Sequence, residues 1–330
     1  MNKIQDRIGY DGSTTKLDEL KSWYDKDKIL SDRIGKRLET INLEYEEERV
    51  NSLLQKIKNS IHEILLLPPE ELLIWVEKID GEYRDVFSDS SGKESTELGK
   101  QVLKAFDYNH YRSSRLIDLA KKLNVKCCPY CNMHYTLYAE EGNEKIEQLA
   151  KFQFDHFFSK VKYPMLSMSL FNLVPSCAIC NQGKSASDLS LSFHPYYSEI
   201  CKQFKFEIDD PIALLRGEKI NDYIDVNLVA TGCTQSELDN FAKTFHLKAL
   251  YQRHGDVAQE AFDKAYEYPY YSHTNNFGWL WRGSKERSPD YILRLWMGTY
   301  PDEKDIEKRP LTKYCQDLRE QARKAMLSQR

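Results

Sequence analysis

Two Cys-x-x-Cys pairs stand out in the sequence, because four thiolates are a complete ligand set for one metal ion. The first pair is Cys128 and Cys131, and the second is Cys177 and Cys180. Structural zinc is bound tetrahedrally by four such ligands, which leaves no open position for catalysis. The spacing within each pair is typical of zinc sites, although the insert between the pairs is longer than usual. The sequence therefore predicts a closed, structural zinc site.

The remaining cysteines define the alternatives. Cys127 could replace Cys128 as a ligand, but only Cys128 has the two-residue spacing to Cys131. The alternative for the four paired cysteines is that they are buried free thiols without a metal, because cysteine is among the most buried residue types. Three others have no partner pattern and are expected to be core thiols: Cys201, Cys233 and Cys315.

A second group of residues, between and just after the pairs, has different chemistry. Asp155 and His156 are adjacent, and Asn172 and Asn181 follow. Carboxylate and carboxamide oxygens suit a hard divalent cation, and an imidazole can take a proton from water near neutral pH. Neighbours on a strand point to opposite faces, so Asp155 can bind a cation while His156 faces water. These are the parts of a hydrolytic centre.

Supporting roles are predicted for the remaining residues of this group. Asn172 is expected to hydrogen-bond the loop backbone and to hold the His156 ring. Lys184, one helical turn after Asn181, is expected to contact a phosphate. The alternatives are a satisfied core or surface histidine for His156, and turns or helix caps for the two asparagines. Two further histidines are expected to be structural: His134 and His194.

Three segments in this order resemble the HNH endonuclease family in its zinc-knuckle form. They are CPYC at 128–131, FDHFFSK with YPMLS at 154–167, and NLVPSCAICNQGK at 172–184. The resemblance covers residues 125–200 firmly and RPLTK at 309–313 more weakly. It extends to the HNH subunit of Septu-type and retron-associated antiviral systems.

The resemblance implies a ββα-metal core with His156 and Asn172 as catalytic residues. Asp155 and Asn181 would be ligands of one catalytic Mg²⁺ or Mn²⁺. Asn181 stands where the family often has a histidine ligand, so cation binding would depend more on Asp155. The resemblance further implies DNA as the substrate, 5′-phosphate and 3′-hydroxyl ends, and an ABC- or SMC-like ATPase as a partner in antiviral defence.

Composition sets limits on these expectations. The 330 residues are 41% hydrophobic, enough for cores of one to three domains. A net charge of −4 lacks the basic excess common in proteins that bind nucleic acid unaided. Contacts with nucleic acid would therefore be local, or a partner would bring the substrate. The sequence has no long apolar run and no signal peptide, so we expect a cytoplasmic protein without a membrane span. In the reducing cytoplasm, paired cysteines favour metal binding over disulfide bonds.

The hydrophobic pattern predicts an α+β fold, mostly helical, around a small ββα core stapled by the zinc site. We expect an N-terminal helical region at 1–122, the nuclease core at 123–200 and a C-terminal helical region at 201–330. The functional alternatives are a noncatalytic zinc-stapled adaptor that joins partners through its helical arms, and an HNH nuclease that cleaves RNA.

Local patterns predict the individual elements. Apolar residues three and four apart predict a helix from 46 to 67, ended by Pro68-Pro69. Alternating residues at 133–139 and 151–157 predict a hairpin with a turn at 141–143. Trp279 and Trp281 are predicted to lie in a surface loop at 275–287. Further helices are predicted at 70–79, 95–123, 178–187, 236–266, 289–297 and 310–326.

Overall fold

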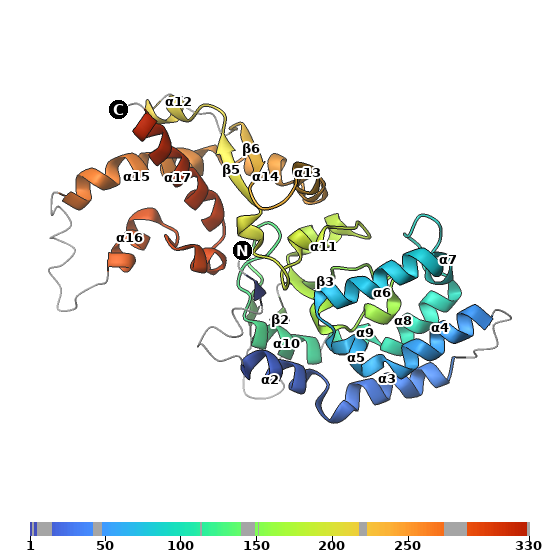
Figure 1. The fold of residues 1–330 in the computed structure, drawn as a ribbon. Helices are drawn as coiled ribbons and strands as arrows, with labels where there is room; N and C mark the ends of the chain where they lie inside the picture. The colour runs from blue at the N-terminus through green and yellow to red at the C-terminus, as the bar shows by residue number, and fades with distance from the viewer. Residues whose placement is uncertain are drawn as a thin grey trace, which may run out of the picture. The chain divides into compact units, whose positions relative to one another are not determined.

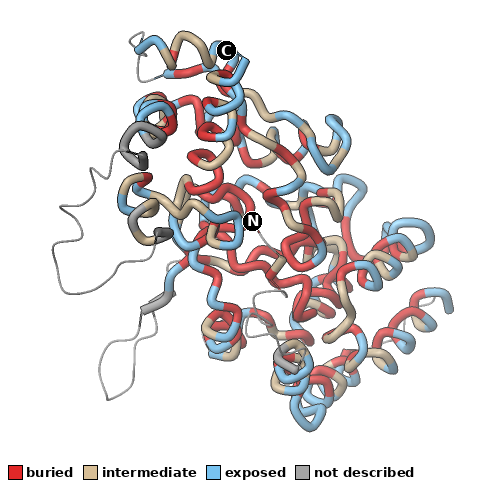
Figure 2. Tube along the Cα trace, turned by 60° about the vertical axis from the view of Figure 1, so that its left-hand side comes forward, coloured by how far each residue is buried: buried red, intermediate tan, exposed pale blue. Residues whose placement is uncertain are grey.

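A computed structural model of the chain describes residues 1, 3–4, 15–41, 48–112, 114–139, 149–150, 152–217, 223–273 and 289–328. Over these residues the fold is α+β and mostly helical, with three two-stranded antiparallel sheets (Figure 1). Buried positions recur among exposed ones along the helices, as amphipathic helices require (Figure 2). In this part of the chain, every helix is too short or too polar to cross a membrane.

The chain divides into two compact units, each made of separate stretches of sequence. Unit 1 comprises Met1–Asn2, Lys126–Tyr135 and Glu199–Arg330, and unit 2 comprises Lys3–Val125 and Thr136–Ser198. The predicted central region, 123–200, therefore contributes to both units. Its first Cys-x-x-Cys pair joins unit 1 because Tyr130 stacks on Phe245 there, with ring centroids 4.7 Å apart.

The helices of unit 2 precede two of the sheets. They are α2 (Thr15–Tyr24), η1 (Lys26–Lys28), α3 (Ile29–Glu39), α4 (Glu48–Asn59), α5 (Ile61–Leu66), α6 (Pro69–Glu82), α7 (Arg84–Phe87), α8 (Glu97–Phe106), α9 (Tyr108–Arg112) and α10 (Arg115–Leu123). The apolar stripe predicted for one helix over 46–67 is buried as expected, but α4 and α5 share it. The break falls at Ser60, whose φ of −108° and ψ of 13° are not helical.

The predicted helix at 95–123 is three helices in the structure. Thr96 begins α8, because its hydroxyl accepts a hydrogen bond from the amide of Gly99 at 3.0 Å. A Cβ at Gly99 would lie 2.2 Å from the carbonyl oxygen of Phe87, so only glycine allows this approach to α7. Asp107 ends α8 in the left-handed conformation, with φ of 54°, and so separates it from α9.

The centre of the chain pairs differently from the predicted hairpin. The strands and helices are β1 (Tyr138–Ala139), β2 (Leu149–Ala150), β3 (Gln153–His156), η2 (Pro164–Leu166), η3 (Leu170–Asn172), β4 (Leu173–Ser176), α11 (Ala178–Lys184) and η4 (Leu191–Phe193). β1 pairs with β2, whereas β3 pairs with β4. The prediction is wrong for β3 because the wholly buried strand β4, far along the chain, is its partner. The predicted turn at 141–143 lies outside the described residues.

Unit 1 contains a sheet that was not predicted from the sequence. Its elements are η5 (Ile200–Lys202), β5 (Phe204–Ile208), α12 (Pro211–Leu215), β6 (Val226–Ala230), α13 (Gln235–Thr244), α14 (Leu247–Tyr251), α15 (Gly255–His273), α16 (Pro289–Met297), η7 (Glu303–Lys308) and α17 (Thr312–Ser328). β5 and β6 are antiparallel with Phe206 opposite Leu228, and the Phe206 ring packs against Tyr251 and Tyr314. β5 alternates between buried and more exposed residues, and the same alternation of apolar and polar residues is present in its sequence.

The C-terminal helices follow the predictions in part. The helix predicted at 236–266 is divided into α13, α14 and α15, and His246 makes the first break with φ of 52°. The helices predicted at 289–297 and 310–326 correspond to α16 and α17. The loop predicted at 275–287, with Trp279 and Trp281, lies outside the described residues.

Candidate metal centre and hydrolytic site

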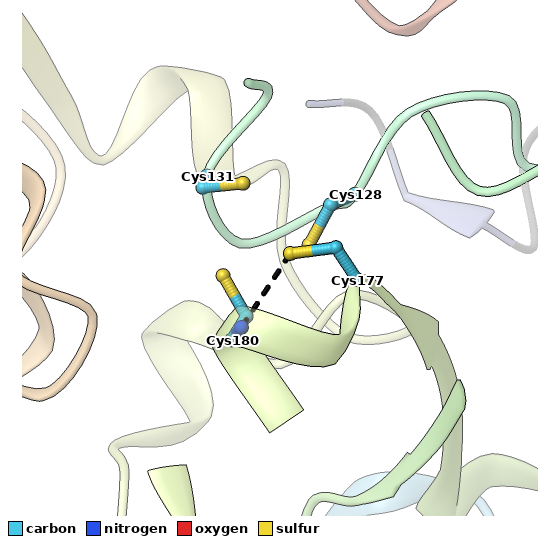
Figure 3. A group of neighbouring side chains, drawn as sticks. All are labelled: Cys128, Cys131, Cys177 and Cys180. Atoms are coloured by element: carbon cyan, nitrogen blue, oxygen red, sulfur yellow. Dashed lines mark hydrogen bonds between the residues drawn. The ribbon is translucent and has the colours of Figure 1, made fainter. Parts of the chain in front are cut away.

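The four paired cysteines come together in the structure (Figure 3). Their sulfur atoms all lie within 4.8 Å of one another, and all four side chains are buried. Around a tetrahedral zinc ion with Zn–S bonds of about 2.3 Å, sulfur atoms are about 3.8 Å apart. Cys128, Cys131, Cys177 and Cys180 therefore fit a structural metal ion such as zinc. Cys127 is buried but does not belong to this group.

Each knuckle is shaped by amide–sulfur hydrogen bonds within its own turn. The amide of Cys180 donates to Cys177 Sγ at 3.4 Å, so that Cys177 caps the start of α11. The amide of Met133 likewise donates to Cys131 Sγ at 3.4 Å. Asn132 adopts the left-handed conformation (φ 50°) that a tight turn after Cys131 needs and that asparagine tolerates. Such bonds favour the thiolate form that binds metal.

The first knuckle is held by η7 and by the segment that follows it. Asn132 donates from Nδ2 to the carbonyl oxygen of Ile306 at 3.0 Å, and its Oδ1 accepts from the amide of Lys313 at 3.0 Å. The amide of Leu311 donates to the carbonyl oxygen of Asn132 at 2.7 Å. Tyr251 adds a hydrogen bond from its hydroxyl to the carbonyl oxygen of Cys131 at 2.6 Å. Residues 309–313 thus have a structural role in supporting this turn.

The predicted hydrolytic residues lie on β3, η3 and α11 of unit 2. Asp155 is opposite Val174 and His156 is opposite Leu173 in the antiparallel pair, and α11 packs on β3. Asp155 and His156 are 2% and 7% exposed, yet both line the same surface cavity. Adjacent residues of a strand normally point to opposite faces. Asp155 and His156 can line the same cavity because His156 is the last residue of β3, where the regular alternation ends.

The imidazole of His156 is held in one orientation by its surroundings. Its Nε2 lies 3.0 Å from the carbonyl oxygen of Ser167, so Nε2 carries the proton and Nδ1 is the acceptor of the neutral ring. The Tyr108 ring packs edge-on against it, with centroids 4.5 Å apart. Burial, with the positive charges of Lys160 and Lys184, lowers the pKa of His156 to about 3. The ring is therefore neutral near pH 7 and can accept a hydrogen bond from water.

Asn172 supports this arrangement from a distance. Its side chain is fully buried and accepts from the amide of Phe158 at 2.7 Å. Its Nδ2 donates to the carbonyl oxygens of Phe158 and Leu166 at 3.1 and 2.9 Å. These are the predicted bonds to the loop backbone. The His156 ring itself is held by Ser167 instead, so Asn172 acts through the loop that carries Ser167.

Asn181 and Lys184 lie on α11 but differ in exposure. Asn181 is half-buried, lines the cavity and donates from Nδ2 to Gln153 Oε1 at 2.5 Å, which leaves its Oδ1 as an available oxygen ligand. Lys184 is fully buried, donates to the carbonyl oxygen of His156 at 2.7 Å and lies 3.5 Å from the Asp155 carboxylate. The expected phosphate contact of Lys184 is therefore wrong, because its ammonium group is enclosed by the protein.

The cavity itself has a volume of about 300 Å³ and is basic apart from Asp155. Around Asp155, His156 and Asn181 it is lined by three cationic side chains: Lys93, Arg112 and Lys160. Sequence reasoning missed these residues. Lys160 stands four residues after His156, at the end of the segment FDHFFSK, and this position is a usable signal. Nothing local could show that α9 would bring Arg112 to β3.

The surroundings of the two further histidines, and of the cysteines predicted to be core thiols, mostly agree with a structural role. His194 is buried, its ring centroid lies 4.1 Å from that of Phe157, and its Nδ1 accepts from the amide of Tyr196. His134 Nδ1 lies 3.8 Å from Cys131 Sγ, beside the cysteine group. Cys201 and Cys315 are buried as expected, whereas Cys233 is only partly buried.

No family model matches this chain, and no curated protein or solved structure matches it. What the cavity can do must therefore be inferred from its own side chains. A neutral imidazole, two oxygen donors and three cations at one cavity are suited to hydrolysis of a phosphate ester, in which a water is deprotonated beside a bound anion.

Proposed function

We propose that this protein is a metal-dependent endonuclease of the HNH type that hydrolyses phosphodiester bonds, with DNA as its substrate. One observation carries the proposal: Asp155, His156 and Asn181, predicted from the sequence as one centre, line a single cavity whose other charged residues are all basic. Because the net charge of the chain is −4, binding to nucleic acid would have to depend on a local group of positive charges. The basic residues of this cavity are such a group.

His156 is the group that takes the proton from the attacking water. Its Nε2 is engaged by the Ser167 carbonyl, so the proton is accepted at Nδ1. The low pKa of the ring reflects burial and the positive charges of Lys160 and Lys184. A phosphate in the cavity supplies negative charge, which raises the pKa of His156 toward the range where a base is effective.

Asp155 and Asn181 would hold the divalent cation, since both residues line the cavity and both side chains carry oxygen atoms. Mg²⁺ and Mn²⁺ prefer such ligands. When bound, the cation supplies charge stabilisation for the phosphate and for the leaving oxygen. Lys184, 3.5 Å from both carboxylate oxygens, offsets part of the charge of Asp155 and keeps it in place.

Cleavage of supercoiled plasmid with added Mg²⁺ or Mn²⁺ tests this proposal. We expect activity that depends on the added cation and falls by about 10²- to 10⁴-fold in His156→Ala, as loss of a general base predicts. His254→Ala, in unit 1, is the matched control and should cleave like the wild type. Full activity of His156→Ala would refute the assigned base.

The same assay distinguishes the alternatives. A noncatalytic zinc adaptor would bind one zinc per chain and show no cleavage with any added cation. An RNA nuclease would cleave single-stranded or duplex RNA and leave the plasmid intact. The role in antiviral defence, together with an ABC- or SMC-like ATPase partner, is supported by the sequence resemblance alone and stays a prediction.

A further inference from the structure

Two cations reach the candidate site from different parts of unit 2. Arg112 is the last residue of α9, in the N-terminal helical part, and Lys160 follows β3. Both line the cavity beside His156. Arg112 is exposed and Lys160 is half-buried. The helical part therefore forms one wall of the site and is more than a scaffold.

Acidic side chains of the described residues do not balance the charge of these two cations. Within the described ranges, neither the Arg112 nor the Lys160 side chain forms an ion pair, and Asp155, the one acidic residue of the cavity wall, is next to Lys184. Burial, and then the positive charge of Arg112, lower the pKa of Lys160, as repulsion between like charges would. A bound anion would relieve this repulsion.

Tyr108 organises this wall from one turn earlier on α9. Its hydroxyl donates to the carbonyl oxygen of Phe154 at 3.3 Å, which ties α9 to β3. The Lys160 ammonium group lies 4.9 Å from the centroid of its ring, a cation–π distance. The same ring packs against His156. One aromatic side chain thus sets the position of both the proposed base and a cavity cation.

We infer that Arg112 and Lys160 form a binding site for a backbone phosphate of the nucleic-acid substrate, positioned by Tyr108. The inference deepens the proposed function, because the anion is taken to belong to the strand that His156 attacks. A guanidinium group matches the oxygens of a phosphate with paired N–H donors, and an ammonium group adds a point charge. Contacts of this kind position a strand without reading its sequence.

Salt-dependent binding to a short DNA duplex tests this site without cleavage. We would measure fluorescence anisotropy of a labelled 12-base-pair duplex with the zinc-loaded protein, without added Mg²⁺ or Mn²⁺, over a series of salt concentrations. Arg112→Gln and Lys160→Gln should each weaken binding and reduce the slope of log Kobs against log salt by about 1. Lys160→Arg should keep the slope of the wild type.

Arg33→Gln and Lys104→Gln are the matched controls, because both residues are exposed and lie outside the cavity. They should bind like the wild type. Equal slopes for wild type, Arg112→Gln and Lys160→Gln would overturn the phosphate site, and so would a wild type that does not bind the duplex at low salt. A different result would refute the proposed nuclease activity and leave the phosphate site intact: these variants weaken binding, but no added cation produces cleavage by the wild type.

Discussion

The Nε2 atom of His156 lies 3.0 Å from the carbonyl oxygen of Ser167, in the loop that connects β3 to β4. This hydrogen bond determines which ring nitrogen carries the proton, and therefore which one can accept a proton from water. The loop is in turn tied down by Asn172, whose three hydrogen bonds join both of its ends. The orientation of the proposed base thus depends on a residue that does not touch it.

Replacing Asn172 should reduce stability and activity together. Asn172→Ala removes the partner of the Phe158 amide and of the Phe158 carbonyl oxygen, whereas the Leu166 carbonyl oxygen keeps its bond from the amide of Ser169. Each buried group left unsatisfied costs about 1–3 kcal/mol. Urea denaturation should show the lower free energy of unfolding. Cleavage by the folded fraction should also fall, because the loop that holds Ser167 loosens.

Asn172→Asp keeps the acceptor for Phe158 but loses both donor bonds, and its buried carboxylate would face the carbonyl oxygens of Phe158 and Leu166. At pH 7 it should be at least as destabilised as Asn172→Ala. Asn59→Ala, at an exposed position of α4, should change neither quantity. Wild-type stability in Asn172→Ala would show that these hydrogen bonds do not hold the loop.

Lys184 should be essential for the fold of the site. Its ammonium group is fully buried between the Asp155 carboxylate and the carbonyl oxygen of His156. Lys184→Met leaves Asp155 without its charged neighbour, and removal of one partner of a buried ion pair costs about 3–5 kcal/mol. Lys184→Gln keeps a donor for the carbonyl and should lose less.

Urea denaturation followed by circular dichroism measures both variants against Lys100→Met, which changes an exposed lysine on α8. Lys100→Met should unfold like the wild type. If Lys184→Met were instead as stable as the wild type while DNA binding weakened, the lysine would be a phosphate ligand after all.

Removal of the structural metal should unfold the protein at least in part. We expect one zinc per chain by elemental analysis, and Cys177→Ser should lower both the zinc content and the melting temperature, because zinc binding contributes directly to folding. Cys233→Ser is the control, since that thiol is outside the four-cysteine group. Full zinc content in Cys177→Ser would exclude the four-thiolate site.

Asn181 should determine how much added cation is needed. Asn181→Ala removes one of the two proposed oxygen ligands, so half-maximal cleavage should require about 10- to 100-fold more Mn²⁺, with activity partly restored at saturation. Gln182→Ala, at the next and exposed position of α11, should leave the requirement unchanged. An unchanged Mn²⁺ requirement in Asn181→Ala would remove Asn181 from the cation site.

Short-range patterns in the sequence determined several of the helices and which four cysteines form the candidate metal site. Two Cys-x-x-Cys pairs predict one site because the spacing within each pair already suits two ligands of a tetrahedron. The apolar stripe of α4 and α5 was visible because helical neighbours are three and four residues apart. Asp155, His156 and Asn181 could be singled out by chemical type together with their proximity to the cysteines.

Only the tertiary structure decided how these elements meet. The partner of β3 is β4 rather than the nearer strand, Lys184 points inward, and α9 brings Tyr108 and Arg112 to the cavity. Each of these outcomes depends on contacts between residues far apart in the chain. The period of a strand or helix specifies which face is buried but not what covers it. The burial of surrounding side chains settled that choice.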